Sequence, residues 1–168
     1  MTDNSQFNDN NLSKGRTFHS KKYEGKKVLI LGLGLNDGGV GSARFFAKQE
    51  ARVKVTDLKN REILKDSLAK LADFPEIEYV LGEHRYEDID WADIIIRNPA
   101  LRPDNEYRVY AEKSGKIVET DVGIFLQFVS PQQMIGITGT KGKSTTSNLI
   151  YYALKEHFGD VILAGNIG

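Results

Sequence analysis

The sequence predicts an α/β protein in which a domain with a parallel sheet is followed by the start of a second α/β domain. Short apolar runs typical of buried strands alternate with helical patterns from Lys27 onward. A glycine-rich turn follows the first apolar run, and a second glycine-rich run occupies residues 136–146. Strands that alternate with helices favour a parallel sheet covered by helices on both faces.

The first elements are expected to form a βαβ unit. The apolar run 28–31 is typical of a buried strand, and 42–49, with alanine and phenylalanine at helical spacing, indicates a helix. The β-branched segment 53–56 predicts the second strand, and 62–72 predicts the second helix. The apolar face of that helix is expected to hold Ile63, Leu64, Leu68 and Leu71.

The same alternation continues along the chain. A third strand is expected at 77–81, and a fourth at 92–96, where three isoleucines follow one another. A helix over 105–114 precedes a short strand at 116–118, and an apolar helix is expected over 122–129. With the βαβ unit before them, these elements complete a Rossmann-like domain.

A polar linker at 130–133, Ser-Pro-Gln-Gln, separates this domain from a second unit. The second unit is expected to contain a strand at 134–137, a glycine-rich loop, a helix over 147–158 and a strand at 161–163. The side chains expected to face inward on its helix are Leu149, Ile150, Ala153 and Leu154. Two strands and one helix cannot close a core, so we expect a truncated domain. The expected organisation is a flexible tail over 1–25, a Rossmann-like domain over 26–130 and the start of a second domain over 131–168.

The composition argues against several classes of function. Lysine plus arginine and aspartate plus glutamate number 23 each, so no global field attracts nucleic acid or an anionic membrane. Cysteine is absent, which excludes disulfides and cysteine zinc sites and fits a reducing compartment such as the cytoplasm. The longest apolar stretch, Val28 to Leu35, is too short to span a bilayer. We therefore expect a cytoplasmic protein that neither binds nucleic acid nor inserts into a membrane.

The run 136–146, Gly-Ile-Thr-Gly-Thr-Lys-Gly-Lys-Ser-Thr-Thr, indicates a phosphate-binding loop between a strand and a helix. Glycines allow backbone N–H groups to turn toward a phosphate, and the helix N-terminus adds partial positive charge. Lys143 is expected to reach the outer phosphates, and Ser144 to supply a hydroxyl for Mg²⁺. The strict P-loop pattern requires glycine where the chain has Ile137. A glycine-rich turn with an exposed lysine is the alternative.

A second candidate nucleotide site follows the first strand. Gly32-Leu33-Gly34, with Asp57 23 positions after Gly34, is similar to the dinucleotide fingerprint G-x-G-x-x-G and its distant acid. The third glycine falls at Asp37, and the glycines that follow suggest a loop about two residues longer than in that fingerprint. These departures disfavour NAD or NADP and favour a different nucleotide, with a structural turn as the alternative. Asn98-Pro99-Ala100, after the fourth strand, is placed where open α/β sheets bind ligands, or is a plain turn.

The chain resembles the Mur ligase family, and within it the branch that adds D-glutamate to UDP-N-acetylmuramoyl-L-alanine. The motifs that carry the resemblance are Gly32-Leu33-Gly34, Asp57, Asn98-Pro99-Ala100, the loop 136–146 and Gly165-Asn166-Ile167-Gly168. The resemblance covers about 26–168, which corresponds to the first domain of that family and the opening of its central ATPase domain. In that family the first domain is Rossmann-like and holds UDP.

The resemblance also implies roles for individual residues. Those implied near the UDP-muropeptide are Leu35, Asn36, Asp57, Leu58, Lys59, Asn98, Pro99, Ala100 and Asn166. Those implied at ATP are Gly139, Thr140, Lys141, Gly142, Lys143, Ser144 and Thr145. Among them Lys143 and Ser144 are implied as catalytic, and Ser144 and Thr145 as Mg²⁺ ligands. The chain departs from the family's usual Ser-Pro-Gly at 98–100 and carries Lys141 where the ATP loop has asparagine.

The implied reaction is ATP-dependent amide bond formation in peptidoglycan precursor synthesis. The substrate carboxylate is phosphorylated, and the amine of D-glutamate attacks the acyl phosphate, a reaction that depends mainly on positioning and charge stabilisation. No covalent nucleophile is required, and the three histidines, His19, His84 and His157, are expected on the surface or on a helix face rather than at a metal.

Further ligands and the D-glutamate pocket of the family lie beyond the position of Gly168. We therefore expect a monomeric N-terminal fragment that is inactive alone. The alternatives are a Mur ligase of the L-alanine-adding type and a nucleotide-binding module without catalysis. A GTPase or kinase is disfavoured because its phosphate loop would follow the first strand, and a folylpolyglutamate-type ligase normally lacks such a preceding domain.

Overall fold

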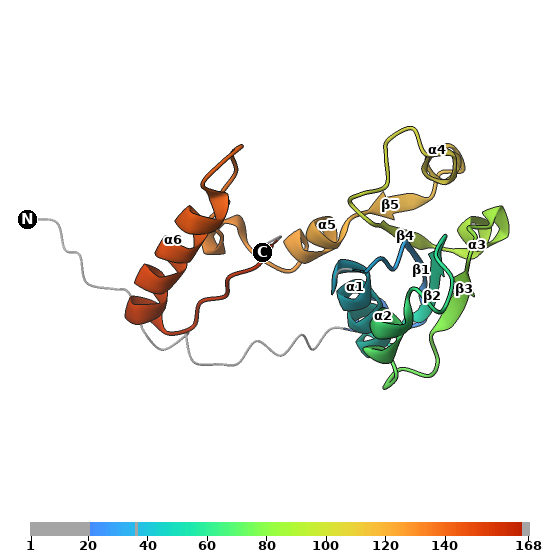
Figure 1. The fold of residues 1–168 in the computed structure, drawn as a ribbon, viewed down its shortest axis with the longest axis horizontal. Coiled ribbons are helices and arrows are strands. Elements are labelled where there is room, and N and C mark those ends of the chain that lie inside the picture. The colour runs from blue at the N-terminus through green and yellow to red at the C-terminus, as the bar shows by residue number, and fades with distance from the viewer. Residues whose placement is uncertain (1–20, 36, 166–168) are drawn as a thin grey trace, which may run out of the picture. The chain divides into compact units, whose positions relative to one another are not determined.

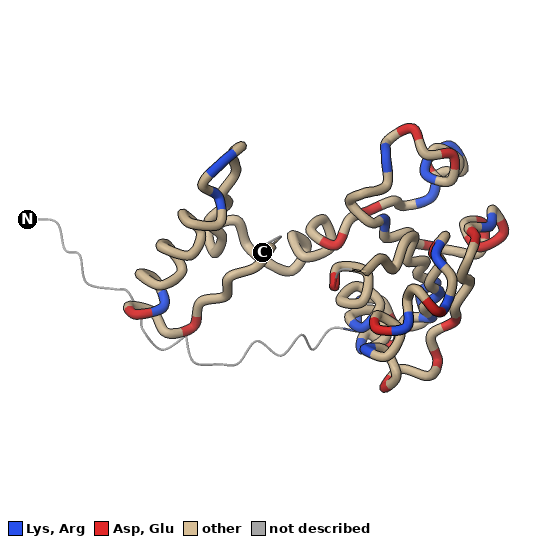
Figure 2. Tube along the Cα trace, in the orientation of Figure 1, with Lys and Arg blue, Asp and Glu red and all other residues tan. Residues whose placement is uncertain are grey.

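The computed structural model describes residues 21–35 and 37–165 of the chain. It divides the protein into two compact units, the first ending at Ile124 and the second beginning at Phe125. The first unit is built on a five-stranded sheet with helices around it (Figure 1), which confirms the predicted α/β class. Figure 2 shows basic and acidic residues interspersed along this unit, in keeping with the equal numbers of the two kinds in the whole sequence.

All five strands run parallel, in the order β3-β2-β1-β4-β5. Their bounds are Lys27–Leu31 (β1), Arg52–Asp57 (β2), Glu78–Leu81 (β3), Ile94–Arg97 (β4) and Ile117–Glu119 (β5). β1 is central, with Val28 paired to Val53 on one side and to Ile94 on the other. The strand order changes direction between β1 and β4. The carboxyl ends of these two strands therefore flank the position where open α/β sheets bind ligands.

Helices cover both faces of the sheet. Their bounds are Asp37–Lys48 (α1), Lys65–Ala69 (α2), Tyr86–Trp91 (α3) and Glu106–Lys113 (α4), and a further helix, Asp121–Leu126 (α5), follows β5. Leu29 and Leu31 pack with Ile89 of α3 and Ala111 of α4 on one face. Since successive strand side chains alternate between faces, Ile30 points to the other face, where it lines a pocket with residues of α1. None of the helices described is long and apolar enough to cross a bilayer.

The predicted helix bounds differ most from the structure in α1 and α2, and the helix α3 was not predicted. α1 begins at Asp37 rather than at 42. Its first turns contain Gly38, Gly39 and Gly41, which the sequence analysis assigned to a loop. α2 has five residues instead of eleven, with Leu64 and Leu71 buried beside it and Ile63 53% exposed. α3 was missed because its six residues are mostly acidic or aromatic and carry a single buried apolar side chain, Ile89.

The second unit contains a short 3-10 helix, Pro131–Gln133 (η2), and one long helix, Lys143–Phe158 (α6). The strands expected at 134–137 and 161–163 do not form. A strand requires a hydrogen-bonded neighbour, and neither segment has one in the described part of the chain. The expectation of an inward face on α6 is likewise wrong, since this helix has no buried residue and Leu149 is 68% exposed.

Candidate functional site

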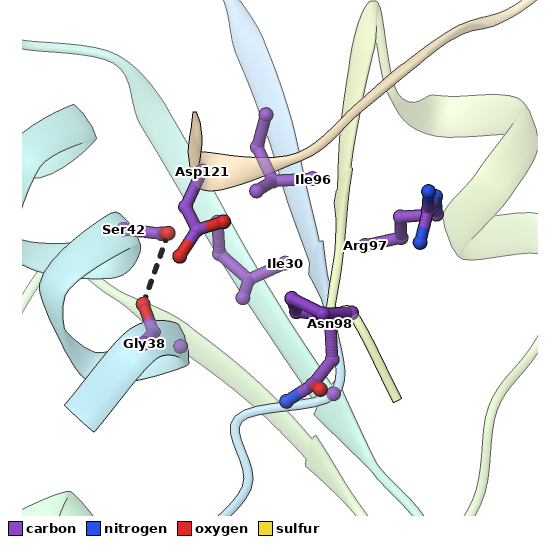
Figure 3. A pocket seen from close by; sticks show the side chains of 10 residues that line it. Ile30, Gly38, Ser42, Ile96, Arg97, Asn98 and Asp121 are labelled. Atoms are coloured by element: carbon purple, nitrogen blue, oxygen red, sulfur yellow. Dashed lines mark hydrogen bonds between the residues drawn. The ribbon is translucent and has the colours of Figure 1, made fainter. Parts of the chain in front are cut away.

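A small pocket lies at the carboxyl ends of β1 and β4, where the strand order changes direction (Figure 3). Its lining includes Gly32, Gly38, Ser42, Asn98 and Asp121. The pocket volume is about 10 Å³, roughly the room needed for one water molecule. A ligand larger than water would therefore lie over this edge of the sheet rather than inside it. The sequence analysis missed Asp121, which had no recognisable motif around it.

Gly32 and Asn98 bring the first glycine loop against the turn after β4. Gly32 has φ +97°, and a Cβ added to it would lie 3.1 Å from Asn98 Cβ. The Gly32 N–H donates to the Thr56 carbonyl at 2.8 Å, and the Asn98 N–H donates to the Leu31 carbonyl at 3.1 Å. The structure thus places two of the predicted motifs side by side.

The Asn98 side chain is used within its own turn. Its Oδ1 accepts a hydrogen bond from the Ala100 N–H at 2.9 Å. This bond shapes the Asn98-Pro99-Ala100 turn and leaves Pro99 and Ala100 exposed at the edge of the sheet. The plain-turn alternative and the ligand-binding interpretation are therefore compatible, because the turn itself is presented at the switch point.

Asp57, at the end of β2, lies beneath the first glycine loop. Its carboxylate accepts the Gly34 N–H through Oδ2 and the Lys59 N–H through Oδ1, both at 2.8 Å. The residue is only 4% exposed. Each oxygen thus accepts a backbone donor and the carboxylate is almost inaccessible, whereas the acid of an NAD site must reach a ribose hydroxyl.

The other residues predicted near this site lie on the surface around it. Leu35 is 59% exposed and Leu58 is 62% exposed, and Lys59 is exposed as well. Exposed leucines at the end of a sheet give an apolar surface that a planar ring could cover. Asn36 and Asn166 lie outside the described residues.

Gly39 explains how α1 packs so closely under the loop. A Cβ on Gly39 would lie 2.2 Å from the Leu33 carbonyl oxygen, closer than any real contact. Gly39 therefore provides the close helix-to-strand packing for which the third glycine of the dinucleotide fingerprint is used. Gly39 lies two positions after Asp37, where the fingerprint has its third glycine, so its position agrees with the expected lengthening by about two residues, although Gly38 and Gly39 themselves belong to α1.

Two side chains of the α2 region hold the glycine loop and were not predicted. The Ser67 hydroxyl donates to the Gly34 carbonyl at 2.9 Å, and Lys70 Nζ lies 2.5 Å from Asp37 Oδ1. Ser67 is 4% exposed, and Arg44 supports the region by donating to the Lys70 carbonyl at 2.8 Å. The sequence contained one signal for Ser67. It is a polar residue three residues after Leu64, at a helical position where an apolar residue is expected.

His84 is buried, which corrects the expectation of a surface histidine. Its exposed fraction is 9%, and Nδ1 lies 2.9 Å from Thr56 Oγ1. Burial lowers the pKa of His84, and the negative charges of Asp57 and Asp88 oppose that change only partly. His157 is exposed on α6, as expected, and His19 lies outside the described residues.

The phosphate-loop residues lie together at the start of α6. Gly142 caps the helix with φ +78°, and Lys143 Nζ donates to the Gly139 carbonyl at 2.5 Å. The side chain of Lys143 thus folds back over the loop. Gly139, Thr140 and Lys141 complete the turn, and all of these residues are exposed.

Ser144 and Thr145 lie in the first turn of α6, where their backbone N–H groups have no partner within the helix. An ammonium group, free amides and two hydroxyls are the donor set that a phosphate chain with Mg²⁺ requires. Among the described residues, no cluster of three histidines or carboxylates could hold a metal ion by itself. Any Mg²⁺ here would therefore depend on hydroxyl and phosphate oxygens.

Comparison with known proteins gives a consistent picture. Residues 26–119 match the family model described as the N-terminal domain of Mur ligase MurD-like proteins. The chain is 46% identical over 143 residues to the UDP-N-acetylmuramoylalanine--D-glutamate ligase of Roseiflexus sp. (strain RS-1), covering 85% of this chain and 30% of that protein. It is 48% identical over 141 residues to the protein of the same name from Borreliella afzelii (strain PKo), with 83% and 30% covered.

The chain thus spans about 30% of the length of the curated relatives that it matches. Among solved structures, it is similar to a pseudomurein peptide ligase type C from Methanothermus fervidus. That similarity has a TM-score of 0.45 and 26% identity, and it covers 77% of this chain and 26% of that one.

Proposed function

The chain belongs to the MurD-like family of Mur ligases, and on that premise we propose that its first unit binds the UDP part of a UDP-muropeptide. The second unit supplies the phosphate loop for ATP. The parent activity is ATP-dependent addition of D-glutamate to UDP-N-acetylmuramoyl-L-alanine, in a monomeric cytoplasmic enzyme of peptidoglycan precursor synthesis.

The arrangement around the first glycine loop carries the proposal of UDP. Gly32 packs against Asn98 at the switch point, so the loop and the turn after β4 present a continuous backbone edge. Asp57 is buried and holds two backbone amides, which removes the acid that an NAD site uses for ribose. A nucleotide whose binding does not require an accessible acid at the ribose is therefore favoured.

The proposed contacts follow the resemblance to the family, and among these residues Leu35, Leu58, Lys59, Pro99 and Ala100 are exposed. The uracil is placed near Asp57, Leu58 and Lys59, and the diphosphate near Asn98, Pro99 and Ala100. Leu35 and Asn36 are proposed to contact the base or the phosphates. Asn166 is proposed on the muropeptide side.

The ATP proposal depends on the start of α6. Lys143 neutralises phosphate charge, Ser144 and Thr145 offer hydroxyls to Mg²⁺, and Gly139, Thr140, Lys141 and Gly142 shape the loop around the phosphate oxygens. When bound, Mg²⁺ would neutralise charge on the phosphate chain and help to orient it. Lys143 and Ser144 are proposed as the catalytic residues, because phosphoryl transfer depends on positioning and on charge neutralisation.

A ligand competition experiment tests the proposal for the first unit. The full chain, labelled with ¹⁵N, is titrated with UDP, with uridine and with NAD⁺ while amide shifts are followed by NMR. We expect UDP to shift amides of the first glycine loop and of the turn at 98–100, and NAD⁺ to shift neither at the same concentration. Preferential binding of NAD⁺, or no response to UDP, would contradict the proposal.

A separate assay concerns turnover. We expect no formation of the D-glutamate amide by this polypeptide alone, because no strand of the described second unit supports its phosphate loop. Production of UDP-N-acetylmuramoyl-L-alanyl-D-glutamate from ATP, D-glutamate and the UDP-muropeptide, followed by mass spectrometry, would contradict this expectation.

A further inference from the structure

The Gly34 backbone is held at both of its polar groups by side chains from distant parts of the chain. Its N–H donates to Asp57 Oδ2 at 2.8 Å, and its carbonyl accepts the Ser67 hydroxyl at 2.9 Å. Asp57 and Ser67 are each 4% exposed. Gly34 itself has φ +71°, in the left-handed region that favours glycine. Its conformation is thus set by glycine and by two buried partners.

This arrangement determines where the next amide points. The described peptide bonds are all trans, so the carbonyl of Gly34 and the N–H of Leu35 point in opposite directions from one peptide plane. Because Ser67 holds the carbonyl, the Leu35 N–H is directed away from Ser67. Within the described part of the chain, the Leu35 N–H donates to no acceptor.

The surroundings oppose rotation of the peptide plane between Gly34 and Leu35. Leu33, two residues before Leu35, is fully buried, and Gly39 packs on its carbonyl from α1. The Gly34 carbonyl carries partial negative charge, and its rotation toward the ligand side would place that charge against a phosphate. The hydroxyl of Ser67 opposes this rotation by giving the carbonyl a buried partner.

We propose that Ser67 is a positioning residue for the phosphates of the bound nucleotide. It acts through the Gly34 carbonyl, which it holds on the α2 side so that the Leu35 amide stays available to a phosphate oxygen. The inference rests on the proposed binding of UDP by the first unit. Ser67 itself is buried and touches no ligand.

The test compares UDP with uridine, which lacks the phosphates, on the full chain and on three variants. Ser67→Ala removes the hydroxyl, Ser67→Thr retains it, and Ser114→Ala removes a serine hydroxyl at the end of α4 as a control. Dissociation constants come from NMR titration, at a temperature where thermal unfolding shows each variant to be folded. The quantity compared is the dissociation constant for uridine divided by the dissociation constant for UDP.

We expect Ser67→Ala to lower this ratio by roughly five- to tenfold, the effect of weakening one hydrogen bond to a charged group. Uridine binding should be almost unchanged, and Ser67→Thr and Ser114→Ala should keep the original ratio. The Leu35 amide should shift with UDP more than with uridine, and this difference should disappear in Ser67→Ala.

Three results separate the failure of this inference from that of the proposed function. If the wild-type chain binds UDP but Ser67→Ala leaves the ratio unchanged, the inference alone is wrong. Equal weakening of UDP and uridine binding would show a structural role only, and would also overturn it. If the wild-type chain does not bind UDP, the proposed function fails, and the inference fails with it.

Discussion

Lys70 Nζ lies 2.5 Å from Asp37 Oδ1, so the carboxylate at the first residue of α1 is paired with a cation from the end of α2. Asp37 occupies the position at which the dinucleotide fingerprint has its third glycine. An unpaired carboxylate there would repel a phosphate at the N-terminus of the helix. The ion pair offsets this charge, so an acid at that position is compatible with the proposed binding of UDP.

The first prediction concerns the charge of this pair. Lys70→Met should weaken UDP binding by about three- to tenfold, because an uncompensated carboxylate then lies near the phosphates. Asp37→Asn should restore binding in the Lys70→Met background. The measurement is UDP titration at low and high salt, where added salt should reduce the effect.

Stability should change little in these variants, since Asp37 and Lys70 side chains are 78% and 49% exposed. Lys65→Met, on the same helix, is the matched control and should bind UDP as the wild type does. A loss of the same size in Lys65→Met, or no rescue by Asp37→Asn, would show that pairing with Asp37 is not the cause.

The second prediction concerns two glycines of α1. Gly39→Ala should destabilise the first unit by about 1–3 kcal/mol or more, since its Cβ would lie 2.2 Å from the Leu33 carbonyl oxygen and backbone would have to move. Gly41→Ala should instead stabilise it by about 0.5–1 kcal/mol, because no atom lies within 4 Å of the added Cβ and alanine favours a helix.

Urea unfolding followed by fluorescence measures both changes, because Trp91 is the single tryptophan of the chain and lies in the first unit. The two substitutions are chemically identical and lie two residues apart. Opposite signs would show that close packing under the loop is specific to Gly39. Similar destabilisation by both would instead indicate a general intolerance of α1 to alanine.

Much of the first unit could be predicted from the sequence. Strands β1 and β4 contain the continuous apolar runs 28–31 and 94–96, which are typical of strands buried on both faces in a parallel sheet, and β2 has buried valines at alternate positions. The helix α4 was also predictable, because Asn105 caps its N-terminus by accepting the N–H groups of Tyr107 and Arg108.

Other features depended on contacts between distant segments. The close approach of Gly39 to the Leu33 carbonyl exists only in the folded loop, and the sequence around Gly39 does not identify that contact. Asp57 was recognised by its spacing, but its two backbone partners are defined only by the folded loop. The strands expected in the second unit failed for the same reason, because an apolar run becomes a strand only beside another strand.

The third prediction concerns pH. Burial lowers the pKa of His84 in the folded state below the ordinary value of 6.5, so the unfolded chain takes up a proton first as the pH falls. The contribution of neutral His84 to stability is therefore complete above about pH 6.5 and is lost as the pH falls from there toward the lower folded-state pKa. The negative charges of Asp57 and Asp88 favour the protonated ring and so limit the size of the change.

Urea unfolding between about pH 5 and pH 7.5 checks this prediction. His84→Gln, which keeps a hydrogen-bonding group near Thr56, should have a smaller loss of stability over this interval than the wild type. His157→Gln, on the exposed face of α6, serves as the control and should follow the wild type. Parallel curves for the wild type and His84→Gln would mean that other groups cause the loss.

The last prediction separates the two lysines of the phosphate loop. Lys143 folds over the loop, with Nζ 2.5 Å from the Gly139 carbonyl, whereas no hydrogen bond or ion pair of Lys141 is found among the described residues. A phosphate in the loop would meet the ammonium group of Lys143 directly, and Lys141 only as a surface charge. Lys143→Met should therefore weaken binding of Mg-ATP by at least about tenfold, and Lys141→Met by less than about threefold.

NMR titration of the full chain with Mg-ATP measures both, and Lys155→Met at the other end of α6 is the control. Raising the salt concentration should abolish the small effect of Lys141→Met and leave most of the effect of Lys143→Met, because a direct contact is screened less than a surface charge. Equal losses in the two variants, with the same dependence on salt, would show that the loop attracts ATP by overall charge rather than through a specific contact with Lys143.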